Sequence, residues 1–119
     1  MLELRLYRNI FWYPITMKTY KLAVTVPERD AEKLRLAISN AGGGKIGNYV
    51  HCSFSVKGLG RFTPQNGAAP AIGTVECPEE VAEERIEINC NEDSLDLVVK
   101  AIRSSHPYEE PVIDIYALV

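Results

Sequence analysis

Apolar and polar residues alternate in four stretches of the chain, which is the pattern of a strand with one buried face. These stretches are residues 20–26, 49–56, 84–90 and 112–118. In the stretches 20–26, 84–90 and 112–118, every second residue is expected to be buried, starting at Tyr20, Ile86 and Ile113 respectively. In the remaining stretch we expect the core to receive Val50, Cys52, Phe54 and Val56.

Two further stretches have the spacing of a helix with one apolar side. The first helix is expected to bury Ala31, Leu34, Ile38 and Ala41. It ends at the three glycines of residues 42–44, because glycine adopts the left-handed cap conformation without steric cost. The second helix is expected to be capped by Asn91, to bury a stripe that starts at Leu95, and to stop before Pro107.

The order strand–helix–strand–strand–helix–strand predicts an α+β fold, the ferredoxin-like βαββαβ sandwich. Right-handed crossovers place both helices on one face of a four-stranded antiparallel sheet and leave the other face uncovered. We expect residues 17–119 to form this single domain. Residues 1–16 are expected to be an N-terminal extension, and the alternative is an extra edge strand, suggested by the alternating leucines.

Composition narrows the class of protein. The chain has 119 residues, of which 46% are hydrophobic and 24% charged, as in ordinary globular domains. A net charge of −3 and the lack of a basic run argue against nucleic acid and anionic membranes as partners. No apolar stretch approaches the roughly 18–20 residues that span a bilayer. Three cysteines without CxxC spacing indicate free thiols and a cytoplasmic location.

His51 and Cys52 are neighbours in a predicted strand. Because neighbouring side chains of a strand point to opposite faces, these two cannot ligate one metal or form a catalytic pair. Cys52 falls in the apolar row and is interpreted as a core residue. His51 is expected on the uncovered face, where Glu87 and Asp114 are also expected. It is there either a hydrogen-bonded residue of a subunit interface or a metal ligand.

A glycine- and proline-rich connection covers residues 57–81, and connections of this length are usually functional or mobile. Its first residues are candidates for ligand binding, through backbone N–H groups and a guanidinium that face an anion. These candidates are Lys57, Gly58, Gly60, Arg61 and Phe62. The alternative is a tight turn at the two glycines, with the phenyl ring packed on the core. No phosphate-binding motif supports the anion hypothesis.

The sequence HPYEEP, residues 106–111, is the other dense group of chemically active side chains. A histidine and carboxylates are typical ligands of a divalent metal, so His106 and Glu109 are candidates for such a site. Tyr108 and Glu109 are also candidates for ligand binding. The alternative is a helix stop in which His106 contacts the helix end and Tyr108 packs against the sheet.

Three segments together resemble a known family: AGGGKIGNYVHCSFSVKGLGRFTPQNGAAPAIG, EEVAEERIEI and SSHPYEEPVIDIYAL. They resemble the inserted middle domain of the NGG-one-interacting-factor-three family, which is similar in fold to the CutA and PII proteins. The resemblance covers about residues 18–119, although residues 73–78 depart from the family's more glycine-rich pattern. The outer lobes that hold the family's dinuclear metal site are not represented in this sequence. Neither that site nor a hydrolase activity is therefore expected here.

These observations predict a non-enzymatic regulatory or binding module. It is expected to self-associate, as a trimer or dimer that buries the uncovered sheet face. A small molecule or protein partner would bind through residues 57–81 and the HPYEEP turn. One alternative is a CutA-like protein that binds copper or another divalent metal through His51, His106, Glu109 or a cysteine. An enzyme with an inter-subunit site is a weaker alternative, and no feature supports a toxin.

Overall fold

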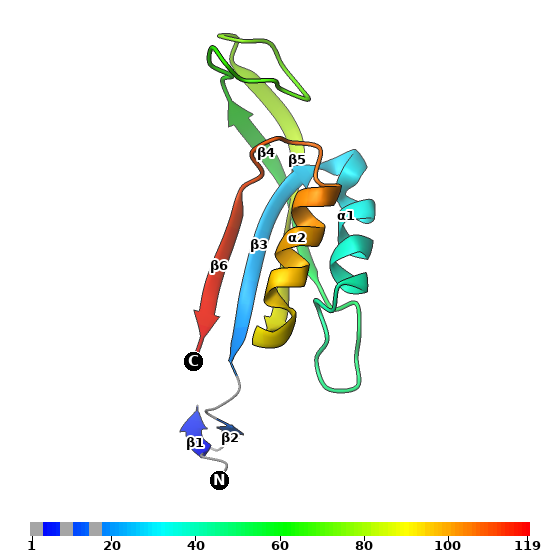
Figure 1. Cartoon of the computed structure of the whole chain (residues 1–119), viewed down its shortest axis with the longest axis vertical. Coiled ribbons are helices and arrows are strands. Elements are labelled where there is room, and N and C mark those ends of the chain that lie inside the picture. Colours follow the sequence, from blue (N-terminus) through cyan, green and yellow to red (C-terminus); the bar gives the residue numbers. More distant parts are fainter. Residues whose placement is uncertain (1–3, 8–10, 15–17) are drawn as a thin grey trace.

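The elements of the domain follow the predicted order (Figure 1). The structure is a computed structural model that describes residues 4–7, 11–14 and 18–119. Its domain consists of β3 (Thr19–Pro27), α1 (Glu28–Asn40), β4 (Phe54–Phe62), β5 (Glu79–Asn91), α2 (Leu95–Ser105) and β6 (Ile113–Leu118). The predicted boundary at residues 16 and 17 falls outside the described residues.

Two short strands precede the domain. β1 (Leu4–Tyr7) and β2 (Phe11–Pro14) pair with each other in an antiparallel two-stranded sheet. The predicted extra strand near the N-terminus therefore exists, but it pairs with β2 and not with an edge of the main sheet.

The main sheet is antiparallel with the strand order β4-β5-β3-β6. In its register, Leu22 of β3 lies opposite Ile88 of β5 and Ile115 of β6. Both helices pack against one face of this sheet, and the core lies between the two layers. It consists of Leu22, Val24, Val26, Ala31, Leu34, Ile38, Ile86, Ile88, Cys90, Val98 and Ile102. The predicted ferredoxin-like fold is confirmed.

The helix ends were predicted with mixed success. α1 ends in a Schellman motif, in which Gly43 N–H donates to Ile38 O and Gly42 adopts a φ of +104°. The predicted cap at Asn91 is wrong, because its side chain makes no capping hydrogen bond. A 3-10 turn, η2 (Glu92–Ser94), comes first, and α2 starts after it.

The prediction for β4 is also wrong, both in its position and in its faces. His51 has a φ of +61°, which lies outside the strand region, so the strand starts only at Phe54. Ser55 lies opposite the buried Ile86, and its hydroxyl accepts a hydrogen bond from Arg35 of α1. The polar row therefore faces the helices. The apolar row lies on the open face, where Phe54 is 65% exposed.

Residues 57–62 and 79–81, predicted to be loop, belong instead to a long β-ribbon. β4 pairs with β5 from Phe54–Glu87 to Phe62–Glu79, whereas the pairing of β5 with β3 ends at Glu83. The last part of the ribbon thus has two strands only, and it projects past the end of β3 (Figure 1). Residues 63–78 form the connection at its tip. Residues 106–112 connect α2 to β6 and lie below the tip of the ribbon in the view of Figure 1.

Candidate functional site

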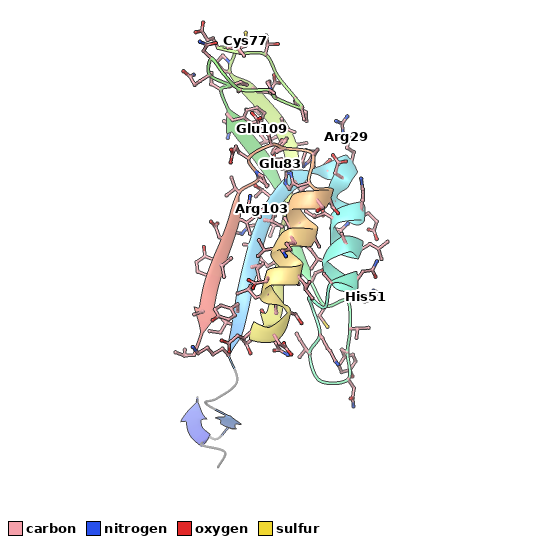
Figure 2. All side chains as sticks on the ribbon, viewed as in Figure 1. Arg29, His51, Cys77, Glu83, Arg103 and Glu109 are labelled. Atoms are coloured by element: carbon pink, nitrogen blue, oxygen red, sulfur yellow. The ribbon has the colours of Figure 1, made fainter. Side chains whose placement is uncertain are left out.

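A cavity of about 520 Å³ lies where the ribbon meets the HPYEEP turn. One wall comes from β4 and the tip connection, and the other comes from the turn and the first residues after it. Figure 2 shows Glu83 and Glu109 at this junction. The two segments that the sequence singled out, residues 57–81 and 106–111, therefore meet at one place.

The floor of the cavity carries a buried carboxylate, that of Glu83, whose residue is only 7% exposed. The hydroxyl of Tyr108 donates a hydrogen bond of 2.7 Å to Glu83 Oε2. Burial and this hydrogen bond both raise the pKa of Tyr108. The phenol therefore remains a protonated donor at neutral pH.

Gly60 leaves room for that carboxylate. A Cβ placed on Gly60 would overlap Glu83 Oε1, and it would also lie within 3 Å of Oε2. Gly58, two residues earlier in the same strand, has open space at the same position. Gly58 is thus spatially unconstrained, whereas the site requires a glycine at position 60.

His106 fixes the position of Tyr108. The backbone N–H of Tyr108 donates to His106 Nδ1 at 3.1 Å, so Nδ1 is an acceptor and Nε2 carries the proton. Nε2 in turn donates to the carbonyl oxygen of Thr25, 2.7 Å away. Both ring nitrogens are used within the protein, and the residue is buried. The ring therefore has a structural role, but it contacts β3 and the turn, whereas the alternative had predicted a contact with the helix end.

The tip connection is held against the turn by two contacts. Glu109 Oε1 accepts a hydrogen bond of 2.9 Å from the backbone N–H of Ala69. The ring of Phe62 meets the ring of Tyr108 edge-on, with centroids 5.6 Å apart. These contacts close the cavity on the side of the ribbon tip.

Five of the predicted ligand-binding residues line the cavity, and two do not. The cavity is lined by Gly60, Arg61, Phe62, Tyr108 and Glu109. Lys57 instead faces the helix side of the sheet, with Nζ 3.9 Å from Glu28 Oε1, and Gly58 lies outside the lining. Sequence reasoning missed Glu83, because a glutamate in the alternating run EERIE is normally a solvent-facing residue. No signal in the sequence could have found it, because the contact of Glu83 with Gly60 depends on the strand register.

The structure does not bring the three predicted metal ligands together. His51 lies beside α1 in a small hollow of about 130 Å³, at the end of the domain away from Glu109 (Figure 2). The prediction that His51 lies on the open sheet face is therefore wrong. Cys52 is half-buried and lies outside the core, contrary to expectation. Among the described residues, no group of three His, Cys, Asp or Glu side chains could hold a metal ion.

Comparison with known proteins identifies relatives that are much longer than this chain. No protein-family model matches it. It is 48% identical over 99 residues to the "GTP cyclohydrolase 1 type 2 homolog" of Mycobacterium tuberculosis, covering 83% of this chain and 26% of that protein. The protein of the same name from Bacillus subtilis is 48% identical over 96 residues, covering 81% and 26%. The chain thus spans about a quarter of the length of these relatives.

Solved structures give the same relationship and extend the fold. A Bacillus cereus protein related to NIF3 superposes with a TM-score of 0.74 at 41% identity, over 86% of this chain and 26% of that one. CutA from Synechococcus elongatus has a TM-score of 0.63 at 18% identity, over 86% and 78%. The Bacillus subtilis GlnK–ATP complex has a TM-score of 0.56 at 13% identity, over 85% and 82%. The last two show the fold alone. The chain is therefore a homologue of a quarter-length, CutA-like segment of NIF3-related proteins.

Proposed function

We propose that this domain is a non-enzymatic regulatory or binding module that holds a small ligand between the ribbon and the HPYEEP turn. The observation that carries the proposal is the cavity with the buried Glu83 carboxylate on its floor. Its volume is within the range of small-molecule sites, and apolar walls with few polar groups are typical of them.

The hydrogen bonds around the cavity leave neither His106 nor Tyr108 available as a general acid or base. A general acid or base needs an atom free to exchange a proton with the substrate. Both nitrogens of His106 are occupied within the protein, and the hydroxyl of Tyr108 is directed at Glu83. The activity in the name of the relatives belongs to proteins of which the matched segment is 26%, so we do not extend it to this domain.

A variant of the ribbon tip tests the proposal. Residues 66–74 would be replaced by a short Gly-Ser linker, which removes one wall of the cavity and leaves β4 and β5 paired. The matched control replaces the exposed loop of residues 45–48, at the other end of the domain. Ligands found by a thermal-shift screen of metabolites should stabilise the wild type and the control, and not the tip variant. A tip variant that keeps every such response would contradict the proposal.

We also propose that the module self-associates through the open sheet face, as a trimer or dimer. Three large side chains lie exposed there: Phe54 at 65%, Val56 at 48% and Tyr116 at 50%. Their burial between subunits would remove apolar surface from water. Native mass spectrometry should find an oligomer for the wild type and monomers for the double variant Phe54→Ser, Val56→Ser. A monomeric wild type would refute this part of the proposal.

We place the module in the cytoplasm. Support comes from Cys52, Cys77 and Cys90, which are all free thiols, as expected in a reducing compartment. None of the helices in the described part of the chain is long and apolar enough to cross a membrane. Cell fractionation followed by immunoblotting tests the location, and recovery outside the cytoplasmic fraction would contradict it.

A further inference from the structure

We propose that the cavity binds a small organic cation, an amine carried on an apolar body. This inference rests on the proposed binding function and names the chemical class of the ligand. Three independent features of the cavity lead to it: the sign of its charge, the unused oxygen of Glu83, and its apolar walls.

The charged groups that line the cavity are mostly carboxylates. Glu83, Glu109 and Glu110 contribute negative charge, and Arg61 contributes the opposing positive charge. The guanidinium of Arg61 is paired outside the cavity lining, with Nε 3.0 Å from Glu80 Oε2. Arg61 was the basis for expecting an anion from the sequence. Because its charge is offset by Glu80, the cavity favours a cation.

Glu83 has one carboxylate oxygen, Oε1, that is available to accept a hydrogen bond from a ligand. Its Oε2 accepts the hydrogen bond from Tyr108, whereas no hydrogen bond from the described residues reaches Oε1. A buried carboxylate is stable when its charge is paired and its oxygens accept hydrogen bonds. An ammonium group supplies both the opposite charge and up to three donors, and it has no acceptor that would need a partner.

Most of the remaining surface of the cavity is apolar. Its walls include Leu59, Phe62, Pro64, Pro70, Ile72 and Val112. A bare inorganic cation would leave these side chains in contact with water, and a fully polar ligand would be poorly matched to them. The body of the ligand is therefore hydrocarbon or aromatic, and the amine end is directed at the floor.

Three probes of nearly equal size and different charge test the inference: 2-phenylethylamine, 2-phenylethanol and 3-phenylpropionate. Each would be titrated at pH 7 into the 119-residue protein labelled with ¹⁵N, and the amide signals of Gly60, Arg61 and Tyr108 would be followed. The amine should bind at least about tenfold more tightly than the other two, which is the usual effect of a hydrogen bond to a charged group.

Two variants assign the effect to the proposed carboxylate. Glu83→Gln keeps the shape of the side chain and an acceptor for Tyr108, and it should weaken amine binding about tenfold while leaving 2-phenylethanol unchanged. Glu87→Gln makes the same change four residues along β5, outside the cavity lining, and should have no effect. The three probes compared on the wild type still test the charge preference of the cavity if Glu83→Gln does not fold.

The outcomes separate this inference from the proposed function. Equal or tighter binding of the alcohol or the carboxylate would overturn the cation inference and leave the cavity as a ligand site. If none of the probes moved the cavity amides, both the inference and the proposed small-ligand function would fail. Amine-selective binding that Glu83→Gln leaves intact would also overturn the assignment to Glu83.

Discussion

The substitution Gly60→Ala tests the part of the site that is easiest to isolate. The new methyl group would occupy the space of Glu83 Oε1, so the carboxylate must move. Backbone strain is not the issue, because Gly60 is a paired strand residue without a positive φ. The carboxylate is held by its hydrogen bond to Tyr108, and its displacement breaks that bond.

The expected change in the free energy of unfolding follows from two opposing effects. Replacing glycine by alanine at a compatible position stabilises a protein by about 0.4–1 kcal/mol, because the unfolded chain loses freedom. Losing a hydrogen bond to a charged group costs about 1.5–3 kcal/mol. Gly58→Ala has the first effect only, since its Cβ meets open space. Gly60→Ala should therefore be about 1.5–3 kcal/mol less stable than Gly58→Ala.

Urea unfolding followed by far-ultraviolet circular dichroism gives these free energies. The double variant Gly60→Ala, Tyr108→Phe serves as a further control. If both substitutions act on the same hydrogen bond, the sum of the two losses in unfolding free energy will exceed the loss in the double variant. Free energies of Gly60→Ala and Gly58→Ala that agree within about 0.5 kcal/mol, or full additivity in the double variant, would refute the role assigned to Gly60.

Three further predictions concern individual side chains. The pKa of Tyr108 is raised above the usual phenol value of 10.0, so the protonated phenol stabilises the fold fully below pH 10 and this contribution is lost as the pH rises further. Urea midpoints should therefore fall more steeply above pH 10 in the wild type than in Tyr108→Phe, and equal slopes would contradict this. Arg35→Ala should lower the free energy of unfolding by about 1–3 kcal/mol in the same assay, because it leaves the half-buried Glu84 without its 2.8 Å partner, and an unchanged value would exclude a stabilising pair. Added zinc or copper should not raise the melting temperature in calorimetry, because both nitrogens of His106 are occupied; a rise that His106→Ala abolishes would restore the metal hypothesis.

The sequence predicted those elements whose burial is one-sided. β3 and both helices each present one apolar row to the core, so Leu22, Leu34 and Ile102 were recognisable from spacing alone. β4 is different, because it is an edge strand whose apolar row is exposed. Alternation has a period of two and does not state which row is inside. Contacts remote in sequence, namely those of Ser55 with Arg35 and with Ile86, determine its orientation.

The candidate site was predictable in outline only. The glycine-rich connection and the HPYEEP turn are unusual enough to mark its two walls, and residues of both line the cavity. For Gly60 the sequence suggests ligand binding or a tight turn, whereas in the structure it lies in a strand and accommodates a side chain of the neighbouring strand. A requirement of this kind depends on strand register, which local sequence does not reveal.

The ribbon beyond β3 has a consequence for local folding. An isolated two-stranded hairpin is only marginally stable in water, so residues 79–82 and their partners on β4 depend on what holds the tip. The hydrogen bond from Ala69 to Glu109 and the contact of Phe62 with Tyr108 are those supports. A molecule in the cavity would add to them, and backbone amides of the ribbon would then exchange with deuterium more slowly at sites that it never touches.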